Sequence, residues 1–254
     1  MGISAGLAFS EGGKKTFQSV ETIRYSNGII NMEDHNKHIE STYFAFLNTK
    51  AFPCIGAKTA LAKQQAVCMV ASHMACPKDD SAILQFLYRF VDDYRKSDQI
   101  FHSAAIIFEE PVSLTEKVFD ELLWQRLQRL SNMDSEKYRY DNRVDPDPES
   151  GNFSFSLKEE AFFIIGLHPA SSRASRQFSY PTLVFNPHQQ FENLKQSNKY
   201  ESMKATVRKR DIAYSGSVNP MLNDFGKSSE ALQYSGRKYD QPWQCPLHIN
   251  HKTK

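Results

Sequence analysis

Side chains that could bind an anion or a metal ion are concentrated in the last third of the chain. His168 follows an apolar run and precedes Pro169, which restrains its backbone, so its imidazole is suited to face a pocket. Arg173 and Arg176 are three residues apart, and on a helical turn their guanidinium groups would project from one face. Paired guanidiniums match carboxylates or phosphates. The pattern predicts a ligand site; its alternative is a structural histidine beside two solvent-exposed arginines.

A second set of candidates begins where another short predicted strand, residues 182–185, ends. His188 follows this strand in the segment Asn-Pro-His. The segment 216–237 is dense in Gly, Asn, Asp and Ser, and irregular segments of this kind can cover a site through ordered hydrogen bonds. Its candidate side chains are Asn219, Asp224, Glu230 and Arg237. The basic stretch 199–210 between the two lacks the interleaved aromatics of a nucleic-acid groove, which favours a solvated helix face.

The four cysteines do not form a zinc motif or a disulfide framework. They are Cys54, Cys68, Cys76 and Cys245, and no two of them make a CxxC pair. Because the chain shows no export signal, we expect reduced thiols. Each is most simply a small buried side chain at the end of an element. The sequence also lacks nucleotide-loop, metalloprotease and serine-hydrolase motifs, so these activities have no support.

The elements that must position these side chains form an alternating pattern of helices and strands. The predicted helices are residues 38–46, 57–74, 80–95 and 113–130, and the predicted strands are residues 101–108, 153–157, 161–167 and 182–185. This order predicts an α+β fold in a single domain, with an antiparallel-rich mixed sheet flanked by helices. A split βαβ arrangement is one option. Residues 1–36 are interpreted as an N-terminal arm that can be flexible, and residues 37–254 as the functional domain.

Composition restricts the class of protein without naming an activity. The chain has 254 residues and a formal net charge of +2, so no strong field would attract nucleic acid or an anionic membrane. No segment approaches the roughly 20 apolar residues of a transmembrane helix. The first residues lack a basic segment followed by an apolar core, so we expect no signal peptide. We therefore expect a cytoplasmic protein without nucleic-acid or membrane partners.

Several motifs follow one another in a specific order between Phe52 and Pro246. They are FPC at 52–54, GLHPASSRASRQFSYPTLVFNPHQQFENL at 166–194, RKRD at 208–211, GSVNPMLNDFGKSSEALQYSGR at 216–237 and WQCP at 243–246. This order resembles the YqcI/YcgG family. Its members include heme-dependent N-hydroxylases of guanidine-bearing amino acids, such as the arginine hydroxylase of D-cycloserine biosynthesis and the enduracididine hydroxylase of guanitoxin biosynthesis.

The resemblance implies a heme b cofactor, whose iron needs a neutral imidazole or a thiolate as axial ligand. His168 is the preferred ligand and Cys245 the alternative. His188 and Cys54 are further candidates. The heme propionates need cations, for which Arg173 and Arg176 are expected, with Arg208 and Arg210 as second choices.

The resemblance also implies a guanidino amino acid as substrate, dioxygen as co-substrate and an electron donor that the sequence does not identify. Asp224 or Glu230 would bind the guanidinium, Arg237 would bind the carboxylate, and Asn219 is a further substrate-binding candidate. A structural ion pair is the alternative for each charged residue.

Three functions compete at this stage. The first is a heme-dependent monooxygenase that hydroxylates a nitrogen of a guanidine-bearing amino acid such as L-arginine. The second is a heme-binding sensor or carrier without turnover. The third is a heme-free protein that binds a small anion.

Overall fold

The computed structural model of the chain describes residues 22–25, 28–219, 228–239 and 243–251. The chain divides into two compact units, residues 1–38 and 39–254. In the first unit, β1 (Thr22–Tyr25) and β2 (Gly28–Asn31) pair in antiparallel fashion. The predicted flexibility of residues 1–36 stays a prediction, since residues 1–21 lie outside the described part.

The second unit is built on a five-stranded sheet within the described residues. Its strands are β3 (Ala66–His73), β4 (Ser103–Glu110), β5 (Phe155–Leu157), β6 (Glu160–Leu167) and β7 (Thr182–Pro187). The spatial order is β3-β4-β7-β6-β5, with β3 and β4 parallel and every other pair antiparallel. The predicted α+β fold with an antiparallel-rich mixed sheet is confirmed. Because β3 and β4 are direct neighbours, their βαβ unit is not split.

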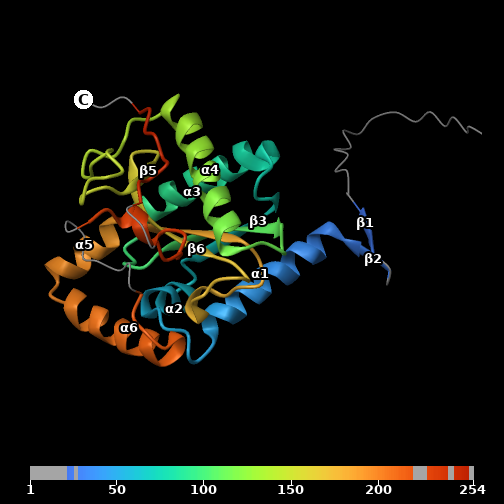
Figure 1. Cartoon of the computed structure of the whole chain (residues 1–254), viewed down its shortest axis with the longest axis horizontal. Coiled ribbons are helices and arrows are strands. Elements are labelled where there is room, and N and C mark those ends of the chain that lie inside the picture. Colours follow the sequence, from blue (N-terminus) through green and yellow to red (C-terminus); the bar gives the residue numbers. More distant parts are fainter. Residues whose placement is uncertain (1–21, 26–27, 220–227, 240–242, 252–254) are drawn as a thin grey trace, which may run out of the picture. The chain divides into compact units, whose positions relative to one another are not determined.

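Six helices accompany the sheet in the described residues (Figure 1). They are α1 (Met32–Asn48), α2 (Ile55–Ala62), α3 (Asp80–Lys96), α4 (Glu116–Ser135), α5 (Gln189–Gln196) and α6 (Tyr200–Ser215). Three short 3-10 turns are η1 (Pro77–Asp79), η2 (Ala174–Arg176) and η3 (Glu230–Gln233). In the part of the chain that is described, no helix combines the length and apolarity that a membrane crossing requires.

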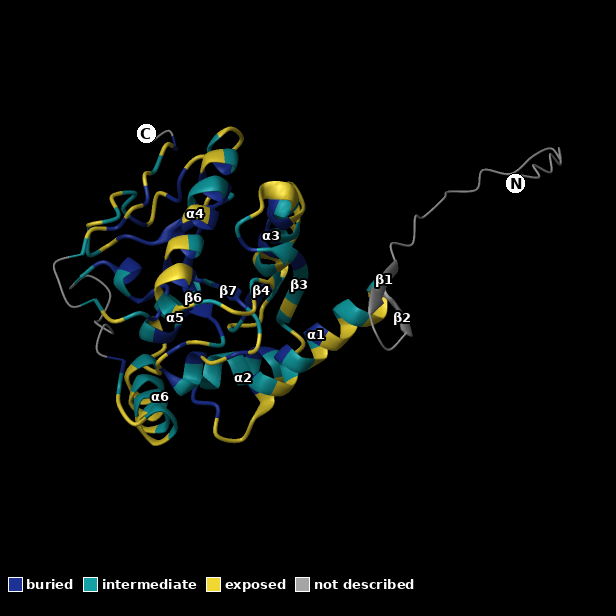
Figure 2. Cartoon of the chain, turned by 45° about the vertical axis from the view of Figure 1, so that its right-hand side comes forward, coloured by how far each residue is buried: buried dark blue, intermediate teal, exposed yellow. Residues whose placement is uncertain are grey.

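The alternation of side chains along β4 divides the core between the two faces of the sheet. Ile106 belongs to the cluster that contains Leu87 of α3 and Leu127 of α4. Its neighbour Ile107 belongs to the cluster that contains Tyr43 of α1. Successive residues of a strand point to opposite faces, so the buried central part of this strand, residues 104–108, needs apolar side chains at every position. Figure 2 shows α3 and α4 on one side of the strands and α2 on the other.

One predicted helix, residues 57–74, is wrong in its second half. The chain leaves α2 through a turn in which Gln64 has a left-handed φ of 58°, and then extends as β3. Ala-rich composition favours a helix locally, but Val67 and Val70 suit a strand, and β4 supplies a parallel partner over the full length of β3. Tertiary pairing therefore decides the structure of this segment.

Candidate functional site

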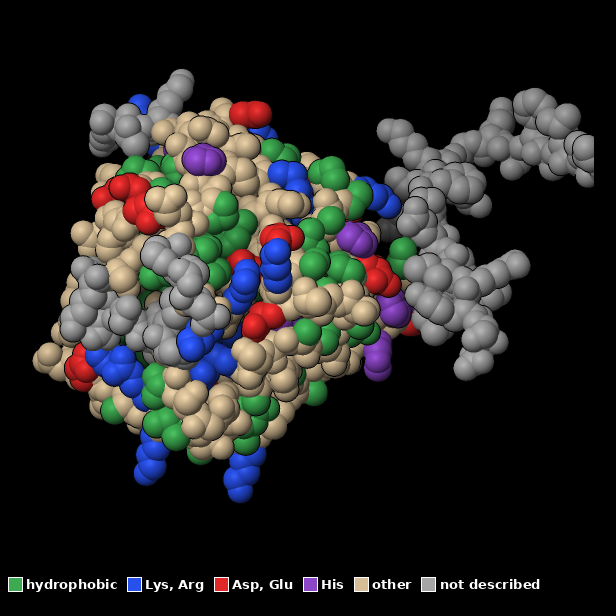
Figure 3. Space-filling view, viewed as in Figure 1, with side chains coloured by type: hydrophobic (Ala, Val, Ile, Leu, Met, Phe, Trp, Pro, Cys, Tyr) green, Lys and Arg blue, Asp and Glu red, His purple; other side chains and the backbone are tan. Residues whose placement is uncertain are grey.

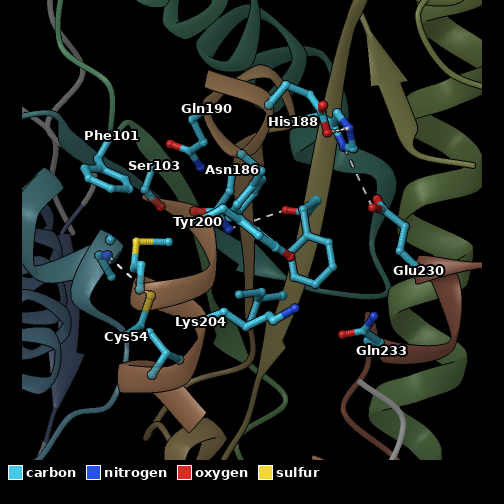
Figure 4. A pocket seen from close by; sticks show the side chains of 18 of the residues that line it. Cys54, Phe101, Ser103, Asn186, His188, Gln190, Tyr200, Lys204, Glu230 and Gln233 are labelled. Carbon is cyan, nitrogen blue, oxygen red and sulfur yellow. Dashed lines mark hydrogen bonds and ion pairs between the residues drawn. The ribbon is translucent and has the colours of Figure 1, made fainter. Parts of the chain in front are cut away.

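A partly enclosed cavity of about 230 Å³ lies where α2, α5, α6 and η3 meet the strands (Figure 4). Its walls are mostly apolar, with side chains that include Phe101, Phe163, Ile165, Phe191, Met203 and Val207. A few polar side chains converge on it, namely Cys54, Asn186, His188, Gln190, Glu230 and Gln233. An apolar pocket with a few convergent polar groups is the usual form of a small-molecule site. This cavity is therefore the candidate functional site.

His188 enters the cavity from the carboxyl end of β7, just before α5. Its backbone N–H donates to the carbonyl of Ala161 at 2.7 Å, which holds the imidazole against the edge of the sheet. Nδ1 lies 3.4 Å from Oγ of Ser154 and 3.9 Å from Oε2 of Glu230. Nε2 lies 3.6 Å from Oε1 of Glu192. Burial lowers the pKa of His188, so the ring is neutral near pH 7, as a metal ligand must be.

Glu230 is a buried carboxyl group on the same side of the cavity. Its Oε1 accepts hydrogen bonds from the hydroxyls of Tyr234, at 2.6 Å, and Ser154, at 2.7 Å. These bonds favour the charged form, but burial outweighs them and raises the pKa of Glu230 to about 8. The group is therefore largely protonated at neutral pH. Perturbed carboxyl groups of this kind are typical of functional sites.

Cys54 lies on the opposite side of the cavity from His188 (Figure 4). Its Sγ accepts a hydrogen bond from the N–H of Ala57 at 3.4 Å and so caps α2. Arg210 of α6 donates to the carbonyls of Lys50 and Phe52, both at 3.0 Å, which fixes the loop that carries the thiol. Burial raises the pKa of Cys54, which favours the thiol over the thiolate.

Cationic side chains of α5 and α6 complete the cavity. Lys195, Lys204 and Arg208 all line it. Lys195 pairs with Glu192 at 2.6 Å, and Lys204 pairs with Glu201 at 2.9 Å. Basic side chains also gather on the face of the molecule over these two helices (Figure 3). The cavity can therefore receive a ligand that is apolar in part and anionic at one end.

His168 does not line this cavity. Strands β6 and β7 are antiparallel, so their carboxyl ends, which carry His168 and His188, lie at opposite edges of the sheet. The ring of His168 is fully buried and stacks on Phe119 with centroids 4.2 Å apart. No described residue forms a hydrogen bond with either ring nitrogen. Burial, with a contribution from Arg176, lowers the pKa of His168 to about 4.

The arginines expected at the propionates lie near His168. Arg173 forms an ion pair with Asp211 at 2.6 Å. Arg176 is buried and donates to the carbonyls of Tyr234, at 2.9 Å, and Gly166, at 3.3 Å. Burial lowers the pKa of Arg176 to about 10. Arg173 thus connects its loop to α6, and Arg176 connects η2 to the residue that follows η3. Neither arginine lines the cavity.

Three further candidates also lie away from the cavity. Cys245 belongs to the core cluster of α3 and α4, where burial raises the pKa of its thiol to about 12. Arg237 contacts Asp120 at 3.4 Å. Asn219 is buried and does not line the cavity. Asp224 lies outside the described residues.

Several residues that line the cavity or bond to its polar side chains were not predicted from the sequence. Ser154 contacts both His188 and Glu230, but nothing in the sequence around it indicated a role at the site. Tyr234 and Gln233 stand in the QYSGR motif, whose density of polar residues was the only indication. Lys204 lies in the stretch 199–210, which the sequence favours as a solvated helix face, and Lys195 carried no signal. The sequence does not show which face of α5 or α6 turns inward.

The buried His168 should make the protein sensitive to acid. Its pKa falls from 6.5 in the unfolded chain to about 4 in the folded protein, so the associated stability is present above pH 6.5 and is lost as the pH falls through 4. When the pH falls from 7 to 4.5, the free energy of unfolding should decrease in both proteins. The decrease should be about 2.5 kcal/mol smaller in His168→Leu than in the parent. Urea unfolding at the two pH values measures this. An equal decrease in the variant and the parent would contradict the conclusion that His168 is buried as a neutral imidazole.

The fold is α+β, and a mostly apolar cavity, the candidate ligand site, lies at one edge of its sheet. The chain belongs to the YqcI/YcgG family, whose model matches residues 43–248.

Two relatives come from Bacillus subtilis (strain 168). The uncharacterized protein YqcI is 28% identical over 220 residues, which cover 80% of this chain and 85% of the relative. The uncharacterized protein YcgG is 29% identical over 157 residues, which cover 58% of this chain and 61% of the relative. No solved structure matches the chain.

Proposed function

We propose that this protein is a heme-dependent monooxygenase that hydroxylates a nitrogen of a guanidine-bearing amino acid such as L-arginine. The observation that carries the proposal is the donor set of the cavity, in which a neutral imidazole, apolar walls and cationic side chains surround one space. The motif order that resembles guanidine N-hydroxylases supports the same class of enzyme.

The side chains that line the cavity are of the kinds that would hold heme b. Phe163 and Phe191 offer apolar surface to a porphyrin, and Lys204 and Arg208 offer cations to its propionates. His188 would bind the iron through Nε2, while Ser154 holds the side of the ring that bears Nδ1. The structure describes no group of three His, Cys, Asp or Glu residues suited to a metal ion, but a porphyrin supplies the in-plane ligands itself. Bound heme would supply the activation of dioxygen, with electrons from an external donor.

Glu230 is the cavity residue suited to a guanidinium group. Its burial favours the neutral acid. A guanidinium beside it would favour the carboxylate, so binding of the cation would release a proton from Glu230. The carboxylate could then hold the reacting nitrogens in a fixed orientation.

The heme spectrum tests the ligand. We expect His188→Ala to lose the Soret band, or to shift it, in protein expressed with a heme precursor. His168 is also buried but lies at the other edge of the sheet, so we expect His168→Leu to keep the band of the parent. Absorption spectra of the purified proteins measure both. The reverse result would identify His168 as the iron ligand. If neither variant changes the Soret band, Cys54 or Cys245 becomes the candidate ligand.

Two alternatives remain as separate proposals. A heme-binding sensor or carrier would show the Soret band without consuming L-arginine in the presence of oxygen and an electron donor. A heme-free protein that binds a small anion is favoured by Lys195, Lys204 and Arg208 at the cavity. Protein that stays colourless after heme reconstitution would leave only this last function.

A further inference from the structure

The turn η3 presents a second polar side chain to the cavity besides Glu230. Gln233 follows three residues later, and in a 3-10 turn side chains at this spacing lie on the same side. Both residues line the cavity, and Figure 4 shows Gln233 on the same side of it as Glu230. Gln233 is only 4% exposed.

The amide oxygen of Gln233 lacks a donor. No described residue donates a hydrogen bond to its Oε1, although the atom is buried. A buried acceptor without a partner destabilises the folded state, because it has lost its hydrogen bonds to water. Such an atom needs an explanation, and in a cavity a bound ligand or an ordered water can supply the missing donor.

Other acceptors around the cavity are satisfied by the protein. Oε1 of Gln190 accepts from the backbone N–H of His102 at 3.1 Å. Oε1 of Glu230 accepts from two hydroxyls. Gln233 therefore differs from Gln190, which is the same residue type in the same cavity with a partner for its oxygen.

We propose that Oε1 of Gln233 accepts a hydrogen bond from an N–H group of the ligand and so selects ligands that carry such a donor there. Glu230 lies one turn away on the same side of η3, so a planar amidine or guanidine with adjacent N–H groups could donate to the carboxylate of Glu230 and to the amide oxygen of Gln233. The identity of the ligand as a guanidino compound rests on the proposed function. The role of Gln233 rests on the unsatisfied oxygen.

The first test compares the ligand-free stability of two matched variants of the full chain. Gln233→Met removes an unsatisfied acceptor, so its thermal midpoint should equal or exceed that of the parent. Gln190→Met removes a satisfied acceptor and leaves the N–H of His102 without its partner, so its midpoint should fall. A fall for Gln233→Met as large as that for Gln190→Met would show a structural role for Gln233 and overturn the proposal.

The second test measures binding of L-arginine to heme-reconstituted protein by spectral titration. Gln233→Met should weaken binding at least tenfold, which is the usual scale for losing a hydrogen bond to a charged group, while heme affinity stays unchanged. Equal affinity for L-arginine in variant and parent would overturn the proposal, as would a heme-loaded parent that binds neither L-arginine nor benzamidine. A colourless parent would contradict the proposed function instead, and the two thermal midpoints would still decide the role of Gln233.

Discussion

Replacing Glu230 by Gln is expected to make the protein more stable in base. The pKa of Glu230 rises from 4.5 in the unfolded chain to about 8 in the folded protein. Stability linked to this group is therefore present below pH 4.5 and is lost as the pH rises through 8, because a charge must form in a buried place. Gln cannot ionise, and its amide oxygen can still accept from Tyr234 and Ser154. When the pH rises from 5 to 9, the decrease in the free energy of unfolding should be about 4 kcal/mol smaller in Glu230→Gln than in the parent.

Denaturant unfolding of the heme-free protein at both pH values measures this difference. Glu192→Gln is the matched control, since Glu192 also lines the cavity but is one-third exposed. The control should follow the pH profile of the parent. A Glu230→Gln profile that coincides with the parent's would mean that Glu230 ionises as an ordinary carboxyl group, and would remove its proposed proton release on guanidinium binding.

The second large effect is expected at Arg126, which joins α4 to the end of β3. The side chain is fully buried, forms an ion pair with Asp80 and donates to the carbonyls of Met74, at 2.7 Å, and Cys76, at 2.8 Å. Removing one partner of a buried ion pair costs about 3–5 kcal/mol, because the other charge keeps its desolvation penalty. Arg126→Met should therefore lower the free energy of unfolding by about this amount.

Arg129→Met provides the control for Arg126. Arg129 contacts the other oxygen of Asp80 at 2.9 Å, but its side chain is 28% exposed, so we expect a loss near 1 kcal/mol. The double variant Arg126→Met with Asp80→Leu should recover part of the loss, since no buried charge then remains. A cost below 1 kcal/mol for Arg126→Met would show that the carbonyls at the end of β3 do not depend on it.

The helix α3 and the strand β4 could be predicted because their patterns are local. Ile83, Leu87 and Phe90 repeat with the period of a helix, and the apolar run 104–108 is long enough for one buried strand. The strand β3 could not be predicted in the same way, because its pairing with β4 overrides the helical preference of the alanines before it.

The sequence by itself determined the family motifs, the α+β class and the two histidines that follow β6 and β7. It could not determine which of the two faces the cavity, since both stand in the same local context of an apolar strand followed by a polar turn. Only the antiparallel pairing of β6 with β7 sends His168 and His188 to opposite edges of the sheet. The same pairing places Arg173 and Arg176 with His168, and brings His188 to Glu230 and to the basic faces of α5 and α6. Spacing along a chain fixes neighbours within one element, whereas the composition of a cavity depends on strand direction, which is a property of the whole sheet.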